Sequence, residues 1–395
     1  MKRLIALAAS LLWLPDQGVA ADSYALPTYT PAYEPKTVDE RGLWMDADRY
    51  EKALAASPLR INDKDLTDYV RRVLCQTVGR DRCEGTRIYI VDVPAFNATM
   101  VANGAMSVWS GLLLRVRSEA ELGAVLGHEF GHFELRHSLK GFQSARSTSD
   151  ALAWTQILGA IARQDVSDTQ VNLLGSYYRF NRAQEMEADL IGLRYLGTSP
   201  YPSRAASEIW QHLMEEADAT AAGRMMRKQQ RYQAGFFDSH PTNLSRADYL
   251  LAEAIKIGDT GDAAAKSHYA SIAAQLPRFL ESQIKLNDFA GTEYILSGIA
   301  ATTGWTGELL QARADMFAMR GNPRDLITAT TLYLNAIDAG YRKPETLRGL
   351  GLSLIKSGQK ADGARYLSEY LALVPNAPDA KMISFYLPQT SGNAK

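Results

Sequence analysis

The stretch GAVLGHEFGHFELRH, residues 123–137, holds three of the six histidines in this chain of 395 residues. His128 and His132 are four residues apart, so on a helix both side chains lie on one face. From that face, two imidazole nitrogens can reach one zinc ion at about 2.0 to 2.1 Å each. The spacing therefore predicts a helix that presents two ligands to a metal ion.

Glu129 follows the first histidine of this pair. Its carboxylate is poorly placed to bind the same metal ion but well placed to take a proton from a zinc-bound water. Because zinc lowers the pKa of such a water towards 7, the pattern indicates hydrolysis near neutral pH. His137 lies one turn beyond the pair, and we interpret it as a surface residue or as a neighbour of the ligands rather than as a ligand.

The helix is expected to begin at Ser118, because Glu121 follows three residues later and completes a capping box. In that motif the hydroxyl accepts from the Glu121 N–H while the carboxylate reaches back. Three glycines recur every four residues along one face of the helix: Gly123, Gly127 and Gly131. Each costs roughly 1 kcal/mol of helix propensity relative to alanine, so we expect another element to approach this face closely.

A catalytic zinc site needs a third protein ligand and an open position, and the segment EMEAD offers the ligand. Glu185 and Asp189 share a helix face with Gly192, whereas Glu187 points almost the opposite way. Both glutamates therefore cannot reach one metal ion, and we choose Glu185. Asp189 is expected to accept the outer ring N–H of a ligating histidine, and Gly192 to face the glycine stripe.

Composition places the chain among globular proteins, with 46% hydrophobic and 22% charged residues, and its length suggests two domains. The chain has 43 Lys and Arg residues against 44 Asp and Glu residues, so its formal net charge is -1. Such a balance predicts no long-range attraction to nucleic acid or to an anionic membrane surface. No nucleic-acid partner is therefore expected.

Residues 1–21 have the features of a secretory signal peptide, with two basic residues, an apolar run and small residues at the end. We therefore expect export, to the periplasm. The apolar run at 151–162 is too short to span a bilayer, so no transmembrane segment is expected in the mature chain. In an oxidising compartment Cys75 and Cys83 are expected to form a disulfide, with two buried free thiols as the alternative.

Residues 22–45 contain several prolines and predict an extended arm, and a first domain is expected at 46–250. Within it, RIYIVDVP at 87–94 is rich in β-branched residues and predicts a strand. Asn103-Gly104 predicts a turn between two short strands that follow. One mixed sheet packed against helices accounts for this pattern.

Residues 251–390 show a helical pattern with an internal repeat. Its last unit places four residues at positions 8, 15, 24 and 32 of a tetratricopeptide unit: Gly351, Gly358, Leu367 and Pro375. A related unit precedes it, from Ala314 to Ala336. We predict a tetratricopeptide-like domain, with an irregular helical bundle as the alternative.

Three motifs, HEFGHFELRH, EMEADLIG and DSHP followed by Arg246, give the segment from about Leu66 to Arg246 a family resemblance. It resembles the zinc metallopeptidase family that includes the CAAX prenyl endopeptidases, the membrane protease HtpX and soluble periplasmic members. With its signal peptide and repeats, the chain is most similar to the periplasmic members that enhance β-barrel assembly. The resemblance implies one Zn²⁺ per chain held by His128, His132 and Glu185, with Glu129 as base and Asp189 beside the ligands. Unlike the membrane members, the chain has no expected spanning helix.

The same resemblance places His240 near the metal ion. There it can donate to the oxyanion of the tetrahedral intermediate or occupy the open position of zinc, which would inhibit the resting enzyme. A loop histidine without metal contact is the third interpretation. Arg246 is expected to pair with an acidic group such as Asp189. The resemblance also places the strand-like stretch ATMVANGAMSVWSG, residues 98–111 with Met106 in its middle, at the sheet edge, where an extended peptide can add as a further strand.

The sequence therefore predicts an α+β zincin-like metallopeptidase domain followed by an all-α tetratricopeptide-like repeat domain. The expected function is an exported zinc endopeptidase that cleaves unfolded or misassembled envelope polypeptides, with outer-membrane protein assembly machinery as a partner of the repeats. The alternative is a repeat-based chaperone or scaffold of that assembly with a silent zinc site. A purely structural zinc site is the third interpretation, and Glu129 argues against it, because a closed site has no use for a base.

Overall fold

The computed structural model of the chain describes residues 34–147, 182–226 and 243–387. The expected signal peptide, most of the expected arm, the apolar run at 151–162 and His240 lie outside the described residues. No helix among the described residues is long and apolar enough to cross a membrane.

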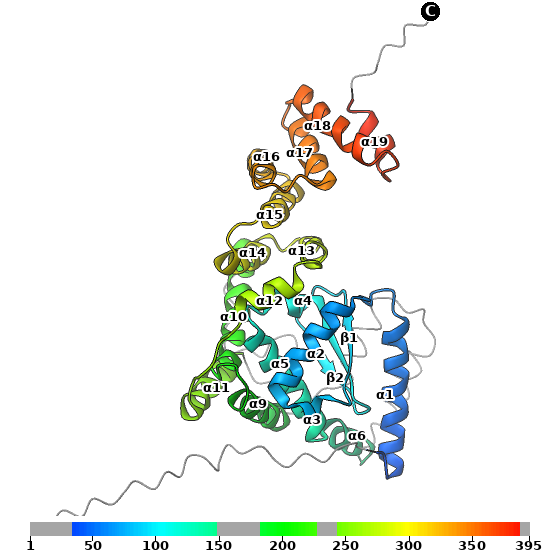
Figure 1. Ribbon diagram of the computed structural model, residues 1–395, viewed down its shortest axis with the longest axis vertical. Helices are drawn as coiled ribbons and strands as arrows, with labels where there is room; N and C mark the ends of the chain where they lie inside the picture. Colours follow the sequence, from blue (N-terminus) through cyan, green and yellow to red (C-terminus); the bar gives the residue numbers. More distant parts are fainter. Residues whose placement is uncertain (1–33, 148–181, 227–242, 388–395) are drawn as a thin grey trace, which may run out of the picture.

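A small mixed sheet forms the centre of the first part of the chain (Figure 1). Its strands are β1 (Arg87–Val91), β2 (Ala98–Met100) and β3 (Ala105–Trp109), in the order β1-β3-β2. β1 pairs parallel with β3, and β2 pairs antiparallel with β3 through the expected turn, where Gly104 has φ 86°. Of the stretch at 98–111 that we expected at the sheet edge, β2 lies there, whereas Met106 lies on the central strand β3. The two edges of this three-stranded sheet are β1 and β2.

Helices cover both faces of this sheet (Figure 1). On one face, Ile88 and Ile90 of β1 share a large apolar cluster with α2 (Lys64–Val78) and α5 (Glu119–Glu134). On the other face, Val91 packs in a separate cluster with α1 (Val38–Ala56). The alternation of side chains along a strand places these residues on opposite faces.

The helix α1 corrects the expectation of an extended arm that runs to residue 45, because the helix already begins at Val38. Thr37 and Glu40 form a capping box at its start, in which the Thr37 hydroxyl accepts from the Glu40 N–H. The proline-rich composition upstream masked this start signal.

The remaining helices before the gap are short: α3 (Arg80–Cys83), α4 (Ser110–Arg115) and α6 (His137–Ser147). Cys75 at the end of α2 and Cys83 in α3 have their Sγ atoms 1.96 Å apart, at bonding distance. The chain can double back between them because Gly79 takes a positive φ of 96°.

The glycine stripe of α5 packs against α9 (Arg182–Gly197) and α2, as expected. A Cβ atom on Gly192 of α9 would lie 3.0 Å from the backbone nitrogen of His128 and 3.2 Å from its Cα. The helix α5 does begin with Ser118 accepting from the Glu121 N–H, at 3.1 Å. The Glu121 carboxylate accepts from the Arg117 N–H rather than from that of Ser118, at 2.8 Å.

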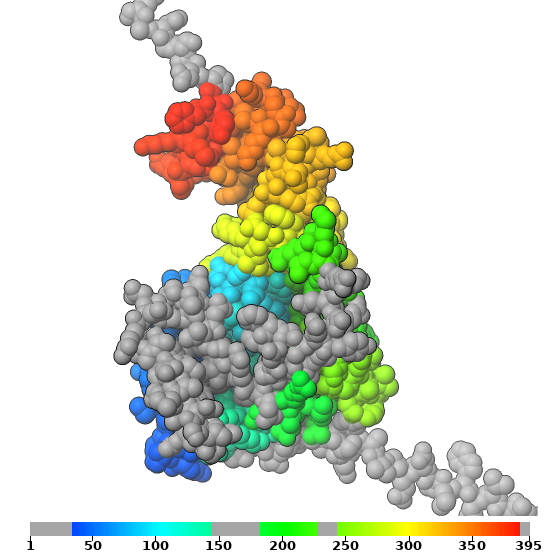
Figure 2. Space-filling model, turned by 180° about the vertical axis from the view of Figure 1, so that it is seen from behind, coloured from blue at the N-terminus to red at the C-terminus, as the bar shows by residue number. Residues whose placement is uncertain are grey.

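Helices make up the rest of the described chain, and the later ones project away from the body that contains the sheet (Figures 1 and 2). The main apolar cluster continues from Ile61 to Met316, so the packing shows no break near residue 250. The helices that follow α9 are α10 (Ala205–Gly223), α11 (Asn243–Ile257), α12 (Ala265–Ile272), α13 (Leu276–Ile284), α14 (Phe289–Thr303), α15 (Gly307–Arg320), α16 (Pro323–Asp338), α17 (Pro344–Lys356), α18 (Lys360–Leu373) and α19 (Ala380–Ser384). Beyond the main cluster, α15 pairs with α16 and α17 with α18, around smaller apolar clusters. Their assignment as tetratricopeptide units stays a prediction.

Candidate metal centre

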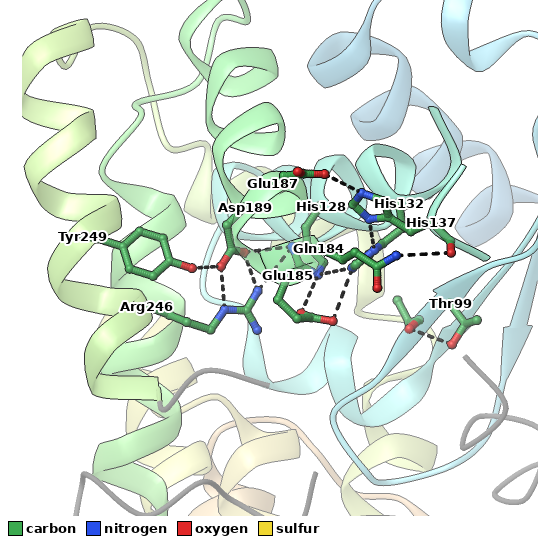
Figure 3. A network of polar contacts seen from close by, with 11 residues as sticks. Thr99, His128, His132, His137, Gln184, Glu185, Glu187, Asp189, Arg246 and Tyr249 are labelled. Atoms are coloured by element: carbon green, nitrogen blue, oxygen red, sulfur yellow. Dashed lines mark hydrogen bonds and ion pairs between the residues drawn. The ribbon is translucent and has the colours of Figure 1, made fainter. Parts of the chain in front are cut away.

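Three side chains from α5 and α9 converge where the two helices approach most closely (Figure 3). The Nε2 atoms of His128 and His132 are 3.0 Å apart. Each lies 3.6 Å from an oxygen of the Glu185 carboxylate. All three side chains are buried, and among the described residues they form the one group of three that can offer ligand atoms to a single metal ion.

Asp189 sets the orientation of the first histidine. Its Oδ1 lies 2.8 Å from His128 Nδ1, one helical turn after Glu185. Burial opposes ionisation of Asp189, but the Arg246 guanidinium outweighs it and holds the pKa of this carboxyl well below its ordinary value. An ionised carboxylate only accepts hydrogen bonds, so His128 Nδ1 carries the proton and Nε2 presents its lone pair to Glu185 and His132.

Arg246 of α11 lies behind Asp189, where the sequence led us to expect it. Its Nε donates to Asp189 Oδ2 at 2.8 Å, and its Nη2 donates to Oδ1. The guanidinium stacks on Trp210 of α10, with Cζ 3.6 Å from the ring centroid. Tyr249, one turn further along α11, donates its hydroxyl to the same carboxylate. Sequence reasoning missed Trp210 and Tyr249; the spacing of Tyr249 from Arg246 was the one available signal.

His137 is fully buried, which excludes the surface position that we considered for it. Its Nδ1 lies 2.9 Å from Nδ1 of His132, and its Nε2 lies 3.0 Å from Oε2 of Glu187 (Figure 3). Glu187 does point away from the three converging side chains, as expected, but it contacts this third histidine. Burial lowers the pKa of His137, so the ring is neutral at pH 7.

Glu129 lies half-buried beside the first histidine of the pair. The backbone of Met100, on the edge strand β2, lies near its carboxylate and favours the ionised form. Burial raises the pKa of the Glu129 carboxyl to about 7. A carboxyl with such a pKa can exchange a proton near neutral pH, which is the range that general acid–base catalysis requires.

The donor set fits zinc. Two imidazole nitrogens and one carboxylate are the ligands of many catalytic zinc sites, which keep a further position open. The Nε2 atoms of His128 and His132 face each other and the Glu185 carboxylate in a buried space. Such a set of electron-pair donors is complementary to a cation.

The structure thus brings together the expected ligands, the expected base and both expected outer residues, Asp189 and Arg246. It leaves His240 untested, because that residue lies outside the described residues.

Comparison with known proteins agrees with this geometry. Residues 61–254 match the profile of peptidase family M48. The metalloprotease LoiP of Escherichia coli is 30% identical over 161 residues, which are 39% of this chain and 57% of LoiP. The E. coli metalloprotease YcaL is 30% identical over 158 residues, 39% of this chain and 56% of YcaL.

The mitochondrial metalloendopeptidase OMA1 of Arabidopsis thaliana is 33% identical over 129 residues, 32% of this chain and 25% of OMA1. The matches thus cover less than two thirds of the length of each of these relatives. The family profile spans the helices that carry the metal centre. Residues 61–254 thus resemble peptidase family M48, and the relatives similar to this chain are named metalloproteases or metalloendopeptidases.

Proposed function

We propose that the chain is a zinc-dependent endopeptidase that hydrolyses peptide bonds in unfolded or misassembled polypeptides of the cell envelope. The convergence of His128, His132 and Glu185 beside Glu129 carries the proposal, because it joins a zinc donor set to a carboxyl whose pKa is about 7. The periplasmic location rests on the signal-peptide pattern of residues 1–21 and on the cysteine pair.

A zinc ion held by these ligands would supply Lewis acidity, which makes water a nucleophile at neutral pH and polarises a peptide carbonyl. Glu129 would take the proton of the attacking water and later return it to the leaving amine. Asp189 and Arg246 keep the His128 ring in the orientation that presents Nε2. His240 stays the candidate for an oxyanion donor or for a ligand of the resting enzyme.

Substrate binding is proposed at β2, since this strand forms the sheet edge next to the centre. The backbone of Met100 on β2 lies near the Glu129 carboxylate, so the strand is within reach of the reacting groups. An extended polypeptide could pair with the side of β2 that faces away from β3 through main-chain hydrogen bonds, which demand little of the sequence that is bound. Weak sequence preference suits an enzyme that removes unfolded chains.

The decisive test compares zinc content and casein cleavage in the wild type, Glu129→Gln and Glu208→Gln. Loss of the base is expected to lower kcat by about 10² to 10⁴-fold while one zinc per chain is retained. Glu208→Gln is the matched control, because this carboxylate pairs with Arg204 on the surface of α10. Full cleavage by Glu129→Gln, or a wild type without zinc, would overturn the proposal.

A chaperone or scaffold function is the second candidate, and a cavity of about 620 Å³ among α13, α15, α16 and α17 favours it. Apolar, aromatic and charged side chains line this cavity, among them Leu280, Asp315, Tyr333 and Tyr341. A mixed lining of this kind can hold a polypeptide segment of an assembly partner or client. Suppression of client aggregation by Glu129→Gln at the wild-type level, with no wild-type cleavage, would favour this second function.

A further inference from the structure

We propose that His137 and Glu187 are positioning residues of the metal centre: they hold the His132 ring in the tautomer that presents Nε2 to zinc. The inference rests on the proposed zinc site and adds two residues to which no role is assigned. Neither residue is a ligand in this scheme. His137 contacts the outer side of the His132 ring, and Glu187 contacts the far nitrogen of His137 (Figure 3).

Hydrogen-bond accounting leads to one arrangement of protons. The Glu187 carboxylate can only accept, so His137 Nε2, 3.0 Å away, must donate. In a neutral imidazole the other nitrogen then has no proton, so His137 Nδ1 is an acceptor. His132 Nδ1, 2.9 Å from it, must therefore be the donor. The proton on His132 Nδ1 leaves Nε2 with its lone pair directed towards His128 and Glu185.

On the other side of the centre, the His128 ring is oriented by a different contact. His128 receives its orientation from Asp189 directly, at 2.8 Å. His132 receives it from Glu187 through a second imidazole, which the burial of His137 shields from water. Both carboxylates belong to α9, as does Glu185, so one helix supplies a ligand and the anchors of both histidines.

The chain turn at Arg136 is what makes this contact possible. The helix α5 ends at Glu134, and Arg136 takes a left-handed conformation with φ 54°. Such a conformation is uncommon for a residue other than glycine, and it redirects the chain so that α6 begins at His137. The ring thereby returns to the outer side of His132.

The test measures zinc affinity of the full chain by competition with a chelating dye, in four variants. His137→Phe removes the acceptor and is expected to weaken zinc binding by about 10 to 100-fold. His137→Gln can restore an acceptor through its side-chain carbonyl and should recover much of the affinity. Glu187→Ala should weaken binding by about 10-fold, at the low end of that range, because its side chain is largely exposed. Met186→Ala, at the exposed neighbouring position of α9, is the control and should bind like the wild type.

The thermal unfolding of the zinc-free variants separates positioning from support of the fold. If His137→Phe and Glu187→Ala melt like the wild type without zinc but bind zinc less tightly, the residues act on the centre. Unchanged affinity in a folded His137→Phe variant would overturn the inference.

A wild type that binds no zinc would refute the proposed function but not this inference. Nitrogen-15 NMR of the histidine rings still tests the inference in that case. The inference requires a proton on Nδ1 of His132 and on Nε2 of His137 in the zinc-free chain. The opposite tautomer of either ring would refute it.

Discussion

Two helix contacts in this molecule use the same packing device but serve different ends. Where α5 meets α9, Gly192 brings the backbones together, and where α17 meets α18, Gly351 and Gly363 do the same. The first contact is lined by histidines and carboxylates, whereas the second is filled by apolar residues such as Leu367. Glycine therefore explains the close approach in both places, and only the residues beside the glycines decide whether a site results.

Replacing Gly192 or Gly351 by valine tests whether the two helix contacts differ in this way. These substitutions are expected to have the largest effect on stability. A Cβ atom at Gly192 would lie 3.0 Å from the His128 backbone, and one at Gly351 would lie 2.7 Å from Leu367 Cγ. Overpacking should lower the free energy of unfolding by about 3 kcal/mol in both variants. Gly192→Val should also weaken zinc binding by at least about 10-fold, because it displaces Glu185 on α9 from the histidines on α5.

Denaturant unfolding and a zinc titration check this pair of variants. Gly351→Val is the matched control, and its zinc affinity should equal that of the wild type. Equal zinc affinity in both variants would show that the approach of α9 to α5 does not set the site geometry. If Gly192→Val fails to fold, Gly192→Ala carries the same comparison with a smaller side chain.

A third contact tests whether a buried histidine is enough to make a site. His268 of α12 is fully buried, and its hydrogen-bond partners within the described part of the chain are neutral: the Tyr69 hydroxyl at 2.7 Å and the Leu113 carbonyl at 3.0 Å. Burial lowers the pKa of His268 from 6.5 to about 4. Below pH 6.5 the unfolded chain therefore binds a proton that the folded chain does not, so this contribution to stability is complete above pH 6.5 and is lost as the pH falls towards 4.

The expected loss of unfolding free energy through His268 is about 2 kcal/mol between pH 7 and pH 5. Urea unfolding of the wild type and His268→Gln measures it as a difference, because glutamine can replace both hydrogen bonds but does not titrate. The same pH dependence in both proteins would contradict the prediction. If only the wild type loses stability as the pH falls, a buried histidine without a carboxylate partner differs from the metal-site histidines in chemistry as well as in place.

Local spacing in the sequence predicted most of the metal centre, for a physical reason. His128, His132, Glu185 and Asp189 each sit in a regular helix, where a separation of four residues determines the shared face. His137 could not be placed in this way, because the regular helix ends before it and the chain turns at Arg136. The position of Trp210 depends on how α10 packs, which no local pattern encodes.

The sheet shows the same limit. The β-branched run and the Asn103-Gly104 turn predicted the strands, because both signals are local. The strand order β1-β3-β2 depends on a parallel pairing between β1 and β3, which turn signals do not reveal. For that reason only β2, of the stretch expected at the edge, lies there, whereas Met106 lies on the central strand.

The smallest expected effect on stability and zinc affinity is that of Tyr249. This residue contacts Asp189, which orients His128, but does not orient His128 itself. Tyr249→Phe removes one donor to Asp189 but leaves Arg246 and His128 bound to that carboxylate. Loss of one such hydrogen bond should lower the free energy of unfolding by about 1 kcal/mol. Zinc affinity should change little, since the remaining partners still hold the carboxylate that orients His128. The comparison with Tyr294→Phe, which removes an exposed hydrogen bond to Glu215, provides the control. A zinc affinity as low as that of Gly192→Val would instead show that the orientation of Asp189 depends on all three partners, and that the network reaches one layer further from the metal ion.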